Sequence, residues 1–106
     1  MATRNGRTAT RKKSAPARAT HKPRRVLVMA FGTGTTAGSL STHPSVETLD
    51  IVEISPEVLE VAPRFESVNR GVVARAGRPG RPEVRLHVDD ARRFVLANSG
   101  PYDVIT

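Results

Sequence analysis

Four short apolar segments, separated by stretches rich in glycine, proline and polar residues, follow one another after residue 25. The first is a continuous run at 26–31, and the others lie at 48–54, 84–88 and 102–105. Short apolar segments bounded by turn-forming residues are typical of β-strands. An uninterrupted run such as 26–31 indicates a strand covered on both faces inside a parallel sheet. We therefore predict four strands, with the first in the interior of the sheet.

The connections between these strands carry helix signals. After the first strand, Thr35 or Thr36 is expected to cap a helix N-terminus, because a threonine hydroxyl accepts hydrogen bonds from free backbone N–H groups. After the second strand, Ser55 followed by Pro56 predicts another helix start. Pro63 lacks a backbone N–H and disrupts a helix interior, so we expect this helix to kink or to end just before it.

The remaining connections complete an alternating order of strands and helices. Residues 67–82 contain three glycines and two prolines, which predicts an irregular loop. A further helix is expected from Ala91 to about Asn98, with Gly100 as its C-terminal cap. Because the crossovers in such sheets are right-handed, this order predicts an α/β fold. We expect an open, three-layer domain whose parallel sheet has the strand order 3-2-1-4.

Positive charge is concentrated at the amino terminus. The 106 residues include 17 Lys and Arg against 10 Asp and Glu, a formal net charge of +7, and nine of the basic residues lie within residues 1–25. The first acid is Glu47. Residues 1–24 contain no Val, Ile, Leu or Phe, so they cannot bury enough apolar surface to offset chain entropy. We predict a disordered basic leader over 1–24 and one domain over 25–106.

This leader has three interpretations, which remain open. It is a solvated tail, or a segment that binds nucleic acid weakly by releasing counterions from phosphates, or a targeting peptide. No aromatic residue lies between its charges to stack on bases. The composition therefore does not decide among the three.

The composition also excludes several classes of protein. The chain has no cysteine, which rules out disulfide scaffolds, thiolate zinc sites and thiol enzymes. No apolar run approaches the roughly 18 to 20 residues that span a bilayer. We expect a cytoplasmic protein without a membrane segment.

The glycine turn and two acids form the candidate site. Gly32 and Gly34 lie between the first strand and its helix, in a nucleotide-type loop that lets a ligand approach backbone N–H groups. Glu53 lies 19 residues beyond Gly34 at the end of the second strand, where an acid can accept hydrogen bonds from both ribose hydroxyls. Asp90 ends the third strand, within reach of an exocyclic amine. These strand ends share one sheet edge, which predicts a nucleoside pocket.

Each of these residues also has a structural interpretation. The glycines are then only a tight turn, Glu53 is an exposed acid at a strand end, and Asp90 is only the N-cap of the next helix. Asp89 and the Arg92–Arg93 pair are assigned to solvent.

Four further residues do not form a predicted site. His43 and His87 have no Asp or Cys at the spacing of a catalytic triad or a metal site, so we predict structural or exposed side chains and no metal centre. Tyr102 and Asp103 lead into the last strand, where we expect packing by the aromatic ring and a polar edge.

Four segments together resemble the spermidine synthase family, a branch of the class I S-adenosylmethionine-dependent, methyltransferase-like Rossmann fold. They are residues 25–35, 52–58, 84–94 and 102–105. The resemblance implies transfer of an aminopropyl group from decarboxylated S-adenosylmethionine to the amine putrescine. S-adenosylmethionine or its decarboxylated form is the implied co-substrate.

The resemblance also assigns roles to individual residues. It implies that Gly32, Thr33 and Gly34 line the nucleoside, that Glu53 holds the ribose hydroxyls, and that Asp90 meets the adenine amine. Synthases of the family carry an acid at the position of Thr33, where it helps to hold the cationic tail of the donor. Here that position is neutral.

The family's catalytic acid follows the strand that ends this sequence, so no catalytic residue is assigned and the sequence leaves open whether the chain is an enzyme. We expect a truncated, N-terminal half of a nucleoside-binding domain, whose last strand, at 102–105, exposes an edge for self-association. Two alternatives remain: part of a general S-adenosylmethionine-dependent methyltransferase, and a non-enzymatic, nucleic-acid-binding protein with a basic arm. A nicotinamide dehydrogenase fits the glycine spacing but not the later motifs.

Overall fold

The computed structural model describes residues 22–98 and 100–106. The leader predicted at 1–24 falls largely outside these ranges. Of its last residues, Arg24 is held by the body of the protein, since its carbonyl oxygen accepts hydrogen bonds from the N–H groups of Glu47 (2.8 Å) and Thr48 (3.1 Å).

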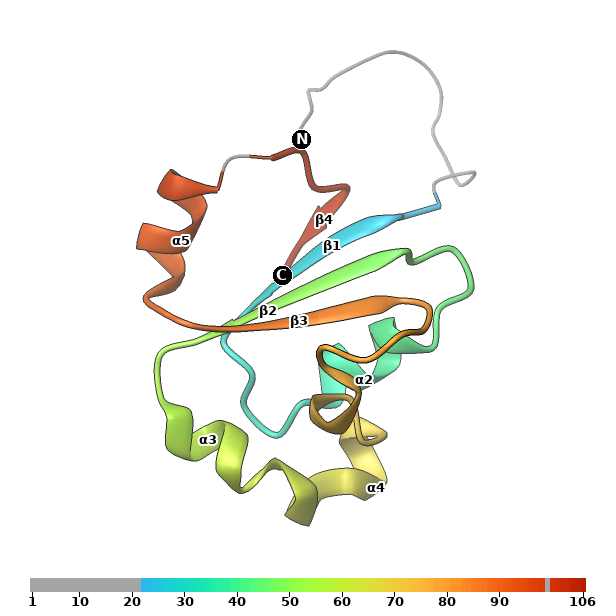
Figure 1. Cartoon of the computed structure of the whole chain (residues 1–106), viewed down its shortest axis with the longest axis vertical. Helices are drawn as coiled ribbons and strands as arrows, with labels where there is room; N and C mark the ends of the chain where they lie inside the picture. The colour runs from blue at the N-terminus through green and yellow to red at the C-terminus, as the bar shows by residue number, and fades with distance from the viewer. Residues whose placement is uncertain (1–21, 99) are drawn as a thin grey trace.

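Four parallel strands form one sheet in the order β3-β2-β1-β4, which confirms the predicted topology (Figure 1). The strands are β1 (Arg25–Met29), β2 (Thr48–Glu53), β3 (Glu83–Val88) and β4 (Val104–Ile105). The three central residues of β1 are fully or almost fully buried, as expected for an interior strand. The carboxyl ends of β1, β2 and β3 therefore share one edge of the sheet, and their amino ends share the opposite edge.

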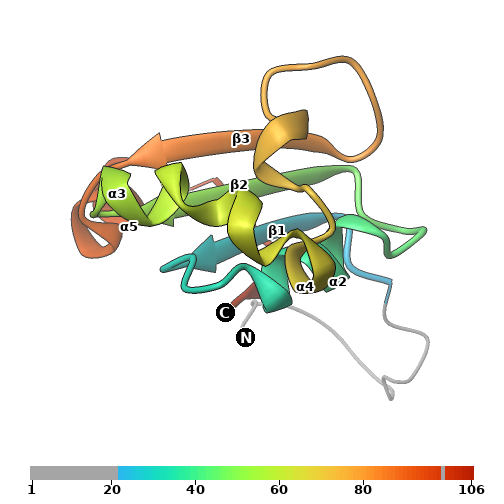
Figure 2. The ribbon, with the colours of Figure 1, turned by 90° about the horizontal axis from the view of Figure 1, so that it is seen from below.

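Helices cover both faces of this sheet. In Figure 1, α2 (Thr35–Ser41), α3 (Pro56–Glu60) and α4 (Glu66–Asn69) lie below the sheet and α5 (Ala91–Ala97) lies above it. Figure 2, seen from below, brings the first three to the front. Successive residues of a strand point to opposite faces of the sheet. The apolar side chains therefore form two clusters, one between each face and the helices that cover it.

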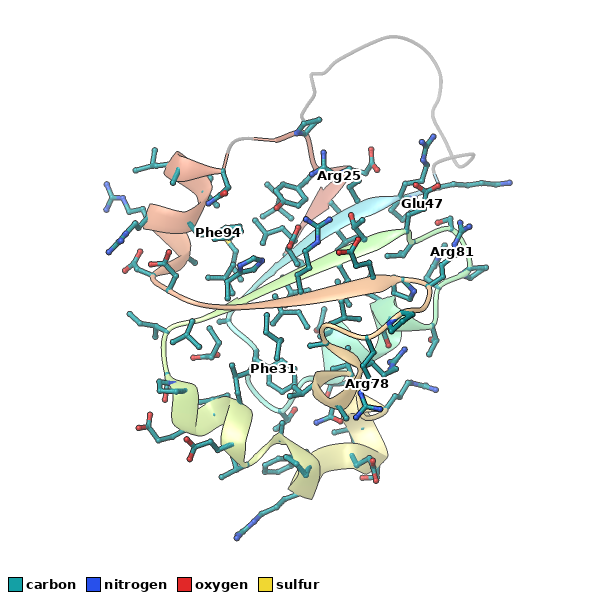
Figure 3. The ribbon with its side chains drawn as sticks, in the orientation of Figure 1. Arg25, Phe31, Glu47, Arg78, Arg81 and Phe94 are labelled. Carbon is teal, nitrogen blue, oxygen red and sulfur yellow. The ribbon has the colours of Figure 1, made fainter. Side chains whose placement is uncertain are left out.

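The apolar clusters differ in size. The larger cluster lies on the side of α2, α3 and α4 and includes Val26 and Val28 of β1 together with Phe31. The smaller cluster joins Leu27 and Val52 to Phe94 of α5. In Figure 3, Phe31 and Phe94 mark these two opposite sides. Most of the core therefore lies on the side away from α5.

The N-cap of α2 differs from the prediction. Neither Thr35 nor Thr36 caps the helix, because both already lie in its first turn and Gly34 is the N-cap, with a φ of 86°. The chain also leaves β1 earlier than the apolar run suggests, since Ala30 takes a φ of 76° and ends the strand at Met29. The turn geometry, and not the hydroxyl side chains, sets the start of this helix.

After β2, the structure agrees with the predicted helix end but not with the predicted loop. Helix α3 ends at Glu60 and Pro63 lies in a short 3-10 helix, Ala62–Phe65, so the predicted early end is confirmed. The prediction of an irregular loop over 67–82 is wrong for its first half. That half contains the end of α4 and a second 3-10 helix, Val73–Arg75.

Contacts of the Asn69 side chain explain why the first half of this segment is regular. Its buried side chain donates hydrogen bonds to the carbonyl oxygens of Ala62 (2.8 Å) and Thr33 (3.1 Å), and its Oδ1 accepts from the N–H of Gly71 (3.0 Å). One amide thus joins the glycine turn after β1 to two segments after β2. Glycine and proline content does not reveal such a tertiary contact.

Helix α5 begins at Ala91 as predicted but has a different C-cap. Asp90 is the N-cap, and Asn98 is the C-cap in place of the expected Gly100. The side-chain amide of Asn98 donates to the carbonyl oxygen of Phe94 (3.1 Å), which satisfies part of the helix end without a glycine. Within the described ranges, no helix is both long enough and apolar enough to cross a membrane.

Candidate functional site

A pocket of about 210 Å³ lies at the carboxyl edge of the sheet, where β2 ends and α5 begins. The carboxyl ends of β2 and β3 meet the start of α5 at this place in Figure 1. The pocket contains three acids from the ends of two neighbouring strands. Its lining residues are Ala30, Val52, Glu53, Ile54, Asp89, Asp90, Ala91 and Arg92. The fold therefore brings together Glu53 and Asp90, as the sequence predicts.

The Glu53 carboxylate is buried and fixed by the backbone. Only 7% of the residue is exposed, so its interpretation as an exposed strand-end acid is wrong. Its Oε1 accepts a hydrogen bond from the N–H of Phe31 (2.7 Å) and its Oε2 accepts one from the N–H of Ser55 (3.0 Å). One side chain thus ties the loop after β1 to the loop after β2. Two charge-assisted hydrogen bonds hold its orientation in the pocket wall.

Asp90 combines a capping contact with a position in the same pocket. Its Oδ1 accepts from the N–H of Arg93 (3.1 Å), which confirms its N-cap role. A carboxylate has about four acceptor positions, so this single bond leaves capacity for a ligand donor.

Asp89 also lines the pocket, so its assignment to solvent from the sequence is wrong. Its Oδ1 accepts from the N–H of Asp90 (2.7 Å) and lies 3.7 Å from the Nε of Arg93. The Asp89 side chain is 30% exposed, so it is neither buried nor fully solvated.

Gly32 and Thr33 lie in the exposed turn after β1, outside the pocket lining. Gly32 has a φ of 60°, and a Cβ built on it meets no atom within 4 Å. The hydroxyl oxygens of Thr33 and Thr35 lie 3.0 Å apart. Contact of this turn with a nucleoside remains a prediction.

Gly34 is required by packing inside the protein. It is buried, and a Cβ on it would overlap the Phe31 ring and lie 2.7 Å from the Cβ of Asn69. Internal packing therefore explains why a glycine is needed at this position, and no ligand has to be invoked. Ala30, which the sequence did not single out, is the residue of this loop that lines the pocket. An alanine gives no sequence signal for its positive φ, because such backbone geometry usually selects glycine.

Asp50 forms a polar cluster that the sequence analysis missed. Its carboxylate, 2% exposed, lies 2.9 Å from the Nε2 of His87 and accepts a 2.9 Å hydrogen bond from the Tyr102 hydroxyl. The Nε of Arg85 lies 3.7 Å away. His87 therefore has a carboxylate partner that its sequence spacing does not reveal, and its side chain is structural, as predicted. The parallel register that sets Asp50 beside Arg85 also brings His87 to the same face.

This cluster lies along the middle of the strands, on the face that carries α5. Burial, followed by the Asp50 hydrogen bond and charge, raises the pKa of the Tyr102 phenol to about 12. Arg25 lies over the Tyr102 ring, 5.3 Å from its centroid. Because Asp50 is engaged by groups of the protein itself, the cluster is structural and distinct from the pocket.

Beside the pocket, the start of α3 is strengthened electrostatically. A hydrogen bond from its own backbone, followed by one from the Ser55 hydroxyl (2.9 Å), lowers the pKa of the Glu57 carboxyl. Among residues 22–98 and 100–106, no group of three His, Asp or Glu side chains is placed to hold a metal ion.

Comparison with known proteins identifies the family. Residues 13–106 match the family model described as the spermine/spermidine synthase domain. The chain belongs to the spermine/spermidine synthase family. A polyamine aminopropyltransferase of Pyrococcus abyssi is 36% identical over 83 residues, which cover 78% of this chain and 29% of that protein. Putrescine N-methyltransferase 1 of Nicotiana tabacum is 34% identical over 84 residues, covering 78% of this chain and 21% of the relative.

The fold of this family member agrees with solved structures. A spermidine synthase in complex with the transition-state analogue AdoDATO matches with a TM-score of 0.65 at 24% identity, over 79% of this chain and 27% of that one. This similarity supports the methyltransferase-like Rossmann fold. The chain thus spans less than a third of the length of each of these proteins.

Proposed function

We propose that this chain forms the donor-binding part of a spermidine-synthase-like transferase. In this proposal the pocket beside Glu53 holds the adenosyl group of decarboxylated S-adenosylmethionine or of S-adenosylmethionine, and the whole protein transfers an alkyl group to an amine. The observation that carries the proposal is the fixed Glu53 carboxylate, which shares the pocket with Asp90.

Glu53 is suited to a pair of neighbouring hydroxyls. Each of its oxygens already accepts one backbone N–H, and each retains a further acceptor position. A ribose presents two adjacent hydroxyl donors, which match two carboxylate oxygens held in one orientation. Because the carboxylate is positioned before binding, little side-chain entropy is lost when the sugar arrives.

Asp90 is suited to the adenine amine. Its carboxylate is at the start of α5, in a pocket that is also lined by Ala91, Ala30 and Ile54. An amine donor is matched by a carboxylate acceptor, and the small or apolar side chains accommodate a base. At about 210 Å³ the pocket is smaller than the roughly 300 Å³ or more of most ligand sites, so we assign it to the nucleoside alone.

The donor tail is proposed to extend toward Thr33. In alkyl transfer from a sulfonium, the protein aligns donor and acceptor and assists deprotonation of the attacking amine. In this proposal, Glu53, Asp90 and the turn at Thr33 supply the donor side of that alignment.

Methyl transfer is the second candidate. The relatives include a putrescine N-methyltransferase at nearly the same identity as the aminopropyltransferase. The neutral Thr33 also lacks the charge that favours a purely cationic tail. The choice between the two transferred groups therefore depends on the donor that the chain prefers.

Isothermal titration calorimetry tests the proposal. The 106-residue chain is titrated with S-adenosylmethionine, its decarboxylated form and 5'-methylthioadenosine, and we expect all three to bind. Glu53→Gln should weaken binding about 10- to 150-fold, because it removes hydrogen bonds to a charged group. Glu60→Gln, at an exposed acid of α3, is the matched control and should bind normally. Absence of heat with a folded sample, shown by circular dichroism, overturns the proposal.

A further inference from the structure

A second cleft lies at the opposite edge of the sheet from the nucleoside pocket. It has a volume of about 380 Å³ and is formed where the chain enters β1, β2 and β3. Its lining residues, which we call the basic cleft, are Lys22, Arg24, His43, Pro44, Ser45, Glu47 and Arg81. Figure 3 shows Glu47 and Arg81 close together at the amino ends of the strands.

The charged groups of the cleft are accessible. Arg24 Nε lies 3.3 Å from Glu47 Oε2, and Arg81 Nη2 lies 3.9 Å from the same oxygen. The two arginine side chains are nevertheless 67% and 63% exposed. Exposed ion pairs contribute little to stability, so a phosphate can compete with Glu47 for these guanidinium groups. Each guanidinium carries five N–H donors, and one carboxylate oxygen leaves most of them available.

The surplus of positive charge is local to this end of the molecule. Lys22, Arg24 and Arg81 outnumber the single acid Glu47 in the cleft. The sequence preceding Lys22 adds six Lys and Arg residues and no acid, whereas residues 26–106 contain eight basic and ten acidic residues. The basic cleft is therefore continuous in sequence with the most cationic part of the chain.

We propose that the basic cleft binds the sugar–phosphate backbone of a nucleic acid without base preference. Arginine matches phosphate in geometry, and phosphate contacts position a protein without reading sequence. The lining contains no Phe, Tyr or Trp, and Pro44 is its only apolar residue. Protein partners are usually anchored by buried aromatic or aliphatic side chains, which this cleft does not offer. The chemistry favours a polyphosphate over an acidic protein.

This site is independent of the donor pocket. The two lie at opposite ends of the strands and share no lining residue. If the donor does not bind, the proposal for the basic cleft is therefore unaffected. If DNA does not bind, the proposal for the donor pocket is likewise unaffected.

Fluorescence anisotropy of a labelled, mixed-sequence DNA duplex provides the first test. We expect the full chain to bind with an affinity that falls steeply with salt. Arg81→Gln should weaken binding and reduce the slope of log K against log salt by about 1. Arg64→Gln changes an exposed arginine outside the cleft and is the matched control. Equal effects of the two substitutions, or no binding at low salt, overturn the proposal.

Removal of the competing acid provides the sharper test. Glu47→Gln frees Arg24 and Arg81 and should tighten DNA binding about two- to fivefold. Glu60→Gln raises the net charge equally but lies outside the cleft, so it should have a smaller effect. Equal tightening by both variants attributes binding to net charge and rejects the cleft. A higher affinity for polyglutamate than for the DNA at equal charge would instead indicate an acidic protein partner and also reject the proposal.

Discussion

The hydroxyl of Tyr102 donates a 2.9 Å hydrogen bond to the buried carboxylate of Asp50. Asp50 lies in β2 and Tyr102 precedes β4, with β1 between these strands, so the bond crosses the central strand of the sheet. Asp103 supports the same junction, since its Oδ2 accepts from the N–H groups of Arg24 and Arg25, each at 2.9 Å. Polar side chains thus set the position of β4 against β1.

Tyr102 makes stability dependent on alkaline pH. Its pKa is raised from the ordinary value of 10.0 to about 12, so the stabilisation is complete below pH 10.0 and is lost as the pH rises toward 12. We expect the wild type to lose more unfolding free energy than Tyr102→Phe across this interval. Because the chain has one tyrosine and no tryptophan, tyrosinate absorbance reports this group alone. In Asp50→Asn the absorbance should titrate at lower pH, and an unchanged titration would contradict the assignment.

Substitutions at Gly34 and Gly32 separate the effect of packing from that of backbone strain in the glycine turn. Both have positive φ, but only Gly34 faces Phe31 and Asn69. Gly34→Ala should reduce the unfolding free energy by about 2 to 4 kcal/mol through overpacking and backbone strain, and Gly32→Ala by about 1 kcal/mol through strain alone. Urea denaturation measures both. Equal losses would show that packing against Gly34 is unimportant.

Thr33 is predicted to influence the choice of donor. Thr33→Asp adds a negative charge that attracts the ammonium of decarboxylated S-adenosylmethionine and repels the carboxylate of S-adenosylmethionine. We expect the affinity ratio to shift about two- to fivefold toward the decarboxylated form. Thr36→Asp, an equal charge on the exposed side of α2, is the control. A common shift in both variants would place the tail elsewhere.

Asp90 is predicted to distinguish adenine from hypoxanthine. The wild type should bind 5'-methylthioadenosine more tightly than its 6-oxo analogue, because a carboxylate accepts from the amine and repels the oxo group. Asp90→Asn keeps the helix cap and adds an amide donor for the oxo group, so the preference should narrow. Calorimetry with both compounds measures the ratio. A ratio unaffected by the substitution would remove Asp90 from the base site.

The outer edge of β4 is predicted to mediate self-association. Among the described residues, β4 pairs with β1 on one side and with no strand on the other, and Ile105 is 51% exposed. Sedimentation of the 106-residue chain should show mass increasing with concentration, and Ile105→Lys should suppress this increase. Leu96→Lys, at an exposed position of α5, should not. Monomeric behaviour of the wild type at high concentration would contradict the prediction.

The sequence by itself determined the strands, their order and the edge at which Glu53 and Asp90 meet. Apolar runs locate strands because burial requires them, and right-handed crossovers then order the sheet. The early end of the helix before Pro63 followed equally from local chemistry, since proline has no backbone N–H. These features depend on residues close together in the chain.

Only the tertiary structure decided which distant groups meet. The contacts of Asn69, the Asp50 cluster and the close packing at Gly34 depend on strand register and helix placement, which no local pattern encodes. The basic cleft likewise gathers side chains from three separate connections. Polar and steric contacts of this kind join segments far apart in sequence, so local sequence patterns do not predict them.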